Sequence, residues 1–215
     1  MSAAPFNLSL SKPRKPYQWS LLMTAPSTAP IGWQKKLVPL SSELGIDTHW
    51  EVVTGDEAFF RCTKAMHNGL QGSPVEIARP LFEAYAEAAD QNAERLRPLL
   101  EDADYVFIHD PQPAGLLSRC PGRKGHWIWR CHIDVSKPHR PTWRYLRMML
   151  EAFDASIYSL SAFARDLPHP QYIIPPSIDP LSPKNAELTP EEVDAAQAQF
   201  GIDPEAAREG VPIGR

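Results

Sequence analysis

Residues 105–111 read YVFIHDP and residues 127–134 read WIWRCHID, and these two stretches decide the fold of the chain. Each begins as an apolar run and ends with a histidine and a nearby carboxylate. Continuous apolar runs of this length are typical of parallel strands buried on both faces. In open α/β sheets, ligands bind outside the carboxyl ends of the strands. The sequence therefore predicts one polar site where these two strands end.

Strands and helices are predicted to alternate on both sides of these stretches. Apolar runs indicate further strands at residues 19–23, 49–53, 155–158 and 172–174. Helical periodicity indicates helices at residues 32–44, 59–70, 80–100 and 143–153, with helical turns near residues 114–118 and 161–166. Such alternation predicts a parallel sheet covered by helices on both faces. We therefore expect an α/β protein with a single Rossmann-like, doubly wound parallel sheet.

The two ends of the chain differ from this middle part. Residues 1–17 are polar, contain proline and lack periodicity, which predicts a flexible tail. Residues 175–183 read PPSIDPLSP, which is typical of an extended linker. Thr189, Pro190 and Glu192 have the spacing of a capping box at the start of a further helix. We therefore divide the chain into a tail (1–17), a sheet domain (18–185) and a final segment (186–215).

Composition and charge argue against several classes of protein. The net charge is −4, and no basic stripe of the kind that follows a phosphate backbone is visible, which argues against nucleic-acid binding. No stretch approaches the roughly 20 apolar residues of a membrane span, and the amino terminus lacks the apolar core of a signal peptide. Cys62, Cys120 and Cys131 are odd in number and lack CxxC spacing, which favours a reducing compartment. We expect a cytoplasmic protein that binds neither nucleic acid nor a membrane.

The polar residues at the two strand ends are candidates for ligand binding, and each has an alternative explanation. His109 and Asp110 fit hydrogen bonding to a ligand, or a loop histidine that caps a backbone carbonyl. Arg130 and His132 share one strand face by alternation, and Asp134 lies just beyond them. These three residues could form a polar wall that binds a ligand. Alternatively, Arg130 and Asp134 could form an internal ion pair that orders the loop.

Other residues have weaker patterns. Lys64, His67, Asn68 and Gln71 recur at helical spacing and form either part of a site or an ordinary solvent-exposed face. Trp127 and Trp129 are predicted to lie in the core, with stacking on a ligand as the alternative for one of them. The chain lacks fixed-spacing metal motifs such as HExxH, so we expect no metal site.

Several segments resemble the trehalose synthase and trehalose phosphorylase group of retaining glycosyltransferases. They follow one another with compatible gaps between about residue 37 and residue 185. In order, they are residues 55–60 (GDEAFF), Thr63, Lys64, His67, Asn68, residues 70–72 (LQG), residues 109–115 (HDPQPAG), residues 129–134 (WRCHID) and residues 174–185 (IPPSIDPLSPKN). The resemblance implies the N-terminal half of a GT-B fold, in which two Rossmann-like domains face each other. It also implies that the C-terminal donor domain is missing from these 215 residues.

The activity implied by this resemblance is that of the acceptor-side domain of a hexosyltransferase in carbohydrate metabolism and the stress response. Such an enzyme reversibly transfers glucose from a nucleotide-glucose or a glucose phosphate to glucose, forming trehalose. The implied ligands are glucose or trehalose, with a nucleotide-sugar or sugar-phosphate donor only when a donor domain is present, and no cofactor. We expect the truncated chain to be inactive alone and to form a homodimer through its uncovered face. The alternatives are a non-catalytic sugar-binding or interaction module and, third, a metal hydrolase.

The resemblance also implies roles for individual residues. It makes His109 and Asp134 catalytic, with His109 near the reacting carbon of the donor sugar. Gly32 is the one glycine that remains of a glycine-rich loop, where backbone amides of the group approach the donor. Acceptor binding is implied for Asp110, Gln112, Arg130, His132, Lys64, Asn68 and Gln71.

Overall fold

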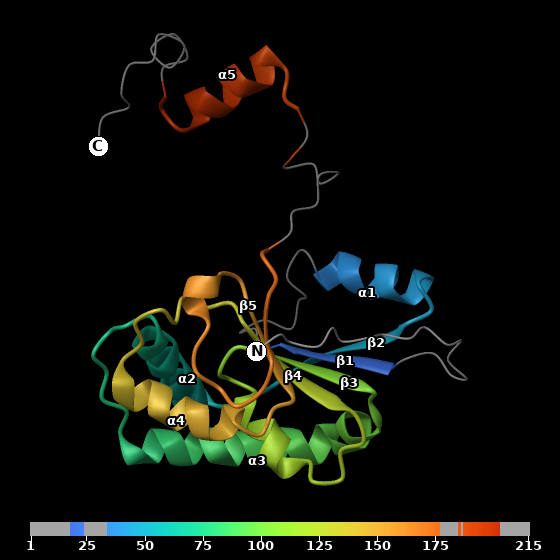
Figure 1. The fold of residues 1–215 in the computed structure, drawn as a ribbon. Coiled ribbons are helices and arrows are strands. Elements are labelled where there is room, and N and C mark those ends of the chain that lie inside the picture. The colour runs from blue at the N-terminus through green and yellow to red at the C-terminus, as the bar shows by residue number, and fades with distance from the viewer. Residues whose placement is uncertain (1–17, 24–33, 177–184, 186, 203–215) are drawn as a thin grey trace. The chain divides into compact units, whose positions relative to one another are not determined.

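The structure is a computed structural model, and it describes residues 18–23, 34–176, 185 and 187–202. The predicted tail at residues 1–17, Gly32 and most of the predicted linker at residues 175–183 lie outside the described residues. The chain divides into two compact units, with the boundary between Pro176 and Ser177. The first unit contains the sheet and is drawn with the rest of the chain in Figure 1.

Six parallel strands form the sheet, in the order β2-β1-β3-β4-β5-β6. The order reverses between β1 and β3, where Leu22 pairs with Ile108. Such a reversal is the point at which open α/β sheets bind ligands. The expected Rossmann-like, doubly wound parallel sheet is confirmed. The strands are β1 (Gln18–Met23), β2 (Asp47–Val52), β3 (Tyr105–His109), β4 (His126–Cys131), β5 (Ala155–Tyr158) and β6 (Gln171–Ile173).

Helices cover both faces of the sheet (Figure 1). One face carries α1 (Gln34–Glu43), and the other carries α2 (Glu57–Leu70), α3 (Arg79–Asp102) and α4 (Arg140–Leu150). Right-handed crossovers explain this division, because the chain moves in one direction from β1 to β2 and in the opposite direction from β2 onward. Short 3-10 helices follow two strands, η1 (Ala114–Arg119) after β3 and η2 (Ser161–Phe163) after β5.

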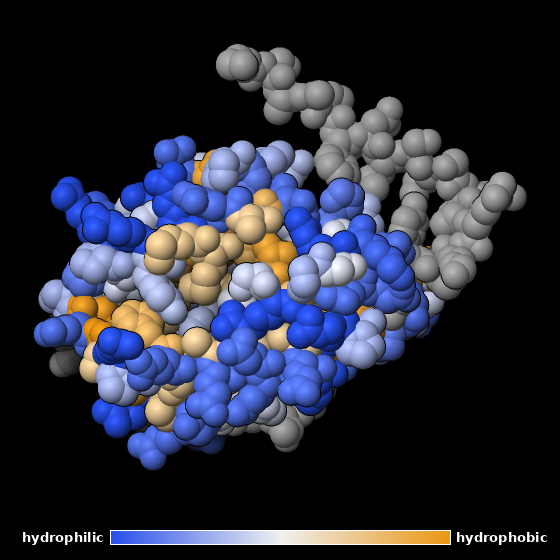
Figure 2. All heavy atoms as spheres, turned by 90° about the horizontal axis from the view of Figure 1, so that it is seen from below, coloured by the Kyte–Doolittle hydropathy of each residue, from blue (hydrophilic) through white to orange (hydrophobic). Residues whose placement is uncertain are grey.

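The hydrophobic core lies between the sheet and helices α2, α3 and α4. Alternate residues of β4, Trp127 and Trp129, have no exposed surface, so both belong to the core and neither can stack on a ligand. The buried residues of α3 recur three and four positions apart, as an amphipathic helix requires: Tyr85, Ala88, Ala89, Asn92, Ala93, Leu96 and Leu100. The outer surface seen from below is mainly hydrophilic, with a smaller apolar area between the polar residues (Figure 2).

The bounds of α2 and α3 agree with the sequence to within two residues, whereas η2 ends three residues early and α4 is displaced. This helix begins at Arg140 and ends at Leu150 instead of spanning residues 143–153, because Pro141 suits the first turn of a helix. Gly45 follows α1 with a φ of +77°, as expected of a glycine that ends a helix. In the second unit, Thr189 and Glu192 form the predicted capping box of α5 (Pro190–Gln199). Among the described helices, none is both long and apolar enough to cross a membrane.

Candidate functional site

The neighbouring strands β3 and β4 end side by side at the carboxyl edge of the sheet. His109 is the last residue of β3, and only 4% of its surface is exposed. Its Nδ1 lies 2.7 Å from Nε2 of His132, which follows β4. The two rings are stacked with centroids 5.0 Å apart, and Trp50 of β2 lies 6.4 Å from the His109 ring. The site therefore lies beside the reversal of strand order, between β2 and β4, which are separated in the sheet by β1 and β3.

Asp110 joins the end of β3 to the end of β4. Its N–H donates to the carbonyl of Arg130 at 2.9 Å, and its own carbonyl accepts from Nε1 of Trp129 at 3.0 Å. Its carboxylate accepts from the backbone N–H of His132 at 2.8 Å. Asp110 has a φ of +60°, and no other described residue besides glycine has a positive φ. The three hydrogen bonds offset the cost of this left-handed conformation, which is about 1–2 kcal/mol for a residue with a side chain.

Two polar side chains that follow or end these strands each have a buried atom without a hydrogen-bond partner within the described residues. Nη1 of Arg130 and Oε1 of Gln112 are both inaccessible to solvent, and neither forms a hydrogen bond within the described part of the chain. The other terminal nitrogen of Arg130 reaches Oγ of Ser159 only at 3.5 Å. A buried polar atom without a partner costs about 1–3 kcal/mol. Arg130 Nη1 is a donor and Gln112 Oε1 is an acceptor, and a hydroxyl group can bond to either kind of atom.

Burial controls the protonation of the site. Burial, with the nearby charges of His132 and Arg130, lowers the pKa of His109 to about 3. Burial and the charge of Arg130 lower the pKa of His132 to about 4. Burial also raises the pKa of Asp110 to about 6, although the hydrogen bond from His132 and the charge of Arg130 oppose this change. At neutral pH both imidazoles are therefore uncharged, and each offers one donor and one acceptor.

Asp134 lies on the loop after β4 and is exposed. Its Oδ1 accepts from the backbone N–H of Ser136 at 2.9 Å, and hydrogen bonds from Ser136 hold the pKa of the Asp134 carboxyl below its ordinary value. Within the described residues, Asp134 forms no ion pair with Arg130. The alternative hypothesis that these two residues order the loop by an ion pair is therefore wrong. Asp134 is thus an ionised, accessible carboxylate at the carboxyl edge.

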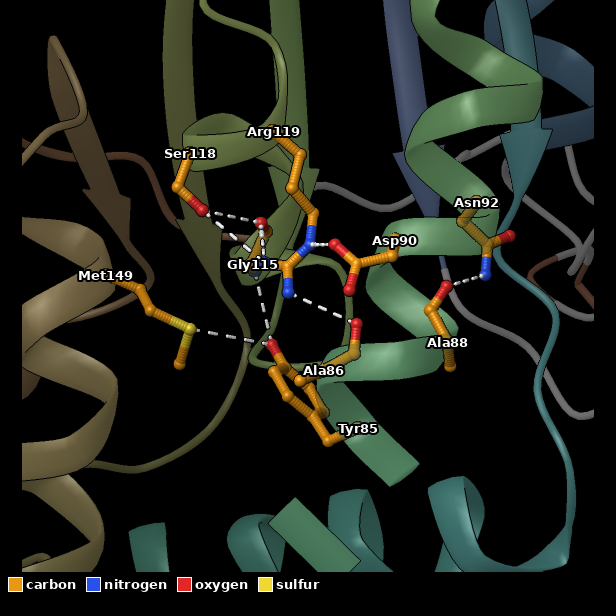
Figure 3. Close-up of polar contacts among 9 residues, drawn as sticks. All are labelled: Tyr85, Ala86, Ala88, Asp90, Asn92, Gly115, Ser118, Arg119 and Met149. Atoms are coloured by element: carbon orange, nitrogen blue, oxygen red, sulfur yellow. Dashed lines mark hydrogen bonds and ion pairs between the residues drawn. The ribbon is translucent and has the colours of Figure 1, made fainter. Parts of the chain in front are cut away.

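Helix α3 supports the loop that carries His109 and Asp110. The hydroxyl of Tyr85 donates to the carbonyl of Pro111 at 2.8 Å and accepts from the N–H of Gly115 at 3.2 Å. Tyr85 is buried and points from α3 toward η1, and its hydroxyl also lies 3.8 Å from Sδ of Met149 (Figure 3). A buried tyrosine hydroxyl needs such partners, and here they fix both ends of the turn after β3.

Two further side chains hold the same region. Arg119 of η1 donates to Asp90 at 2.5 Å and to the carbonyls of Gly115 and Ala86 at 2.8 and 3.1 Å (Figure 3). Asn92 of α3 bonds the backbone N–H of Thr54, after β2, at 2.9 Å and its carbonyl at 2.6 Å. Helix α3 therefore secures the segments after both β2 and β3.

The remaining predicted site residues lie elsewhere. Lys64 and Asn68 line a groove of about 560 Å³ beside α2, together with Glu57, Phe60, Arg61, Ala65, Val75, Glu76 and Leu81. The described lining of this groove includes none of the strand-end residues. Gln71 is exposed and ends α2. Gly32 falls outside the described residues. The structure thus brings together His109, Asp110, Arg130 and His132, and it does not bring Lys64 and Asn68 into contact with them.

Metal binding has no candidate group in the described residues, since no three histidine, cysteine, aspartate or glutamate side chains lie close enough to hold an ion.

The sequence interpretation missed the supporting residues Tyr85, Asn92 and Arg119. One signal was available for Tyr85 and Asn92, because both are polar residues on the buried stripe of α3. The sequence contains no local signal for their partners, which are 26 to 38 residues away.

Comparison with protein families identifies one match over most of the first unit. The family described as "Trehalose synthase, N-terminal domain" matches residues 33–165. A trehalose synthase of Thermococcus litoralis is 42% identical over 172 residues, which are 79% of this chain and 41% of that protein. A trehalose synthase of Rubrobacter xylanophilus is 39% identical over 175 residues, which are 79% of this chain and 42% of that protein. The chain therefore spans about two fifths of the length of the curated relatives it matches.

A solved structure shares the fold at much lower identity. A protein from E. coli, named for trehalose-6-phosphate and bound with UDP-2-fluoro glucose, matches with a TM-score of 0.64 and 15% identity. The match covers 86% of this chain and 54% of that one. The sheet thus corresponds to the N-terminal half of a GT-B fold, as the sequence predicted.

Proposed function

Because the chain belongs to the trehalose synthase N-terminal domain family, we propose that it is the acceptor-side domain of a retaining hexosyltransferase. In this proposal, glucose is transferred from a nucleotide-glucose or a glucose phosphate to a second glucose, forming trehalose. The observation that carries the proposal is the cluster of the neutral pair His109 and His132 with Arg130, whose buried Nη1 forms no hydrogen bond within the described residues. Gln112, on the loop after β3, also has a buried oxygen without a hydrogen bond there. Uncharged donors and acceptors are suited to neutral sugar hydroxyls.

Within this site, we assign His109 and His132 to hydrogen bonding with sugar hydroxyls. Asp134 would accept bonds from hydroxyls, since its carboxylate is exposed and ionised. Asp110 acts through its neighbours, because its carboxylate already holds the backbone of His132. Lys64, Asn68 and Gln71 remain predictions for acceptor binding, and the groove beside α2 is where Lys64 and Asn68 would act.

We propose that glucose transfer requires a donor-binding domain in addition to these 215 residues. The chain spans 41% of the T. litoralis relative, and a glucosyl donor must be held against the acceptor for reaction. Such positioning supplies about 7–11 kcal/mol of a reaction barrier. We expect these residues alone to bind glucose weakly and to form no trehalose from UDP-glucose or glucose 1-phosphate.

Calorimetry with glucose and an assay for trehalose test the proposal together. Binding at millimolar glucose, abolished by Arg130→Ala and preserved in Arg79→Ala, supports an acceptor site, because Arg79 lies on an exposed part of α3. Absence of any binding refutes it. The alternative, a non-catalytic sugar-binding module, is supported if glucose binds but no trehalose forms after a donor-domain chain from a relative is supplied. Trehalose formed by the chain alone would refute the requirement for further residues.

A further inference from the structure

Four arginines converge on one pocket outside the strand-end site. Arg140, Arg144 and Arg147 recur at intervals of four and three residues and so share one face of α4. Arg165 comes from the segment after η2. Together with Pro138 and Trp143, they line a pocket of about 230 Å³.

The positive charge of this pocket is poorly compensated. Arg147 pairs with Glu151 at 2.9 Å. Within the described residues, Arg140 and Arg144 form no ion pair. By contrast, Arg95, Arg119 and Arg123 of the first unit each pair with a carboxylate. Four arginines therefore line the pocket, and one of them, Arg147, is paired with a carboxylate.

Arg165 is held in place by packing. Its guanidinium carbon lies 5.9 Å from the ring centre of Trp143. Its Nη1 donates to the carbonyl of Ser136 at 3.0 Å, and its buried Nε forms no hydrogen bond within the described chain. A guanidinium fixed against an aromatic ring keeps its planar donors in one orientation.

An ordinary solvent-exposed face of α4 explains this arrangement less well. Cations near the first turn of a helix are disfavoured by the helix dipole, and like charges four residues apart destabilise the helix. Arg140 has both disadvantages, because α4 begins at Arg140, and Arg144 has the second, because it lies four residues after Arg140. An anion in the pocket would remove both, since helix N-termini and arginines each favour negative charge.

We propose that this pocket binds the phosphate group of a small phosphorylated metabolite. Guanidinium groups bind phosphate oxygens through paired hydrogen bonds. Pockets for drug-sized ligands have volumes of about 300–1,000 Å³, so a pocket of about 230 Å³ fits a phosphate with a small substituent better than a whole nucleotide. The ligand class is inorganic phosphate or a phosphomonoester such as a hexose phosphate.

This phosphate site is connected to the loop of the strand-end site. Arg165 bonds the carbonyl of Ser136, and the N–H of Ser136 bonds the carboxylate of Asp134. A phosphate bound to Arg165 would therefore contact a side chain that is hydrogen-bonded to the loop that carries Asp134. The inference goes beyond the proposed function and does not depend on glucose transfer.

The test measures binding and its location separately. Calorimetry with inorganic phosphate and with glucose 6-phosphate gives affinities, with neutral glucose as the uncharged comparison. The indole N–H signal of Trp143, assigned with a Trp143→Phe variant, reports by NMR whether the ligand occupies this pocket. We expect both phosphates to shift this signal and to bind more weakly at higher salt.

Charge removal supplies the matched comparison. The double variant Arg140→Gln with Arg144→Gln should bind phosphate at least about tenfold more weakly, whereas Arg79→Gln removes an exposed, ion-paired arginine and should bind normally. Equal affinity for the two ligands would show that the pocket recognises only the phosphate group. Tighter binding of glucose 6-phosphate would show that the pocket also contacts the sugar. An unmoved Trp143 signal, or equal affinities in the charge variants, overturns the proposal. Glucose binding and its loss in Arg130→Ala are measured in a separate experiment. The phosphate-site proposal and the acceptor-site proposal can therefore be refuted independently.

Discussion

Nδ1 of His109 lies 2.7 Å from Nε2 of His132, and the two ring planes are inclined by only 11°. The rings come from the ends of neighbouring strands, β3 and β4. A hydrogen bond between two ring nitrogens needs one N–H and one lone pair, so the pair shares a single proton in this bond. A proton on both of these nitrogens would remove the bond and place two N–H groups against each other.

The first prediction concerns the protonation of this pair. Since the pKa values of His109 and His132 fall to about 3 and about 4, both rings should remain neutral at pH values where ordinary histidines, with a pKa of about 6.5, are charged. Long-range proton–nitrogen NMR spectra recorded through an acid titration check this. The same chain unfolded in urea is the control, and its histidines should titrate near the ordinary value. A folded-state titration of His109 near pH 6.5 would contradict the prediction.

The second prediction concerns Asp110 and acid stability. Its pKa is raised from 3.8 to about 6 in the folded chain, so its contribution to stability is fully present below pH 3.8 and is lost as the pH rises through about 6. Asp110→Asn removes this contribution, and asparagine tolerates the left-handed backbone. Wild-type stability minus that of the variant should therefore fall between these two pH values, by at most about 1.4 kcal/mol per pH unit.

Urea denaturation of both chains at several pH values measures this difference. Asp134→Asn is the control, because that carboxylate is exposed and has no raised pKa. A stability difference for Asp110→Asn that does not change with pH would show that the carboxyl titrates normally.

The third prediction concerns the support of the loop after β3. Tyr85→Phe removes the hydroxyl that bonds Pro111 and Gly115. The buried N–H of Gly115 then loses this acceptor, whereas the carbonyl of Pro111 keeps its bond from the N–H of Ala114. We expect a loss of about 1–3 kcal/mol in the free energy of unfolding and weaker glucose binding, because His109 and Asp110 lie on the same loop. Denaturation and calorimetry measure the two effects. Tyr145→Phe is the control, since the Tyr145 hydroxyl forms no hydrogen bond within the described residues; equal effects in the two variants would refute a role for the Tyr85 hydroxyl.

The fourth prediction concerns the sugar site. His109→Ala should weaken glucose binding about tenfold or more, which corresponds to the loss of a hydrogen bond worth about 1.4 kcal/mol. Lys64→Ala separates the two predicted sets of acceptor residues, because Lys64 lines the groove beside α2. An effect of Lys64→Ala as large as that of His109→Ala would show that the groove also binds the acceptor. Unchanged affinity in His109→Ala would remove the strand-end site from the proposal.

The sequence predicted much of the fold because strands and helices differ in local periodicity. Apolar runs located the six strands, and the stripe of α3 was readable from its spacing. The start of α4 was misplaced, because the apolar stripe begins after the proline that starts the helix. The Arg130–Asp134 ion pair was also wrong, because sequence proximity does not tell which way a loop side chain turns.

By itself, the sequence determined that two parallel strands deliver His109, Asp110, Arg130 and His132 to one edge of a sheet, since chain direction and alternation fix where each strand ends. Only the tertiary structure decided how these residues meet: the ring-to-ring bond of His109 and His132, the left-handed Asp110, and the anchoring of the loop by Tyr85. These contacts join residues that are 22 to 26 positions apart. Packing between separate elements selects such partners, and local periodicity contains no information about them.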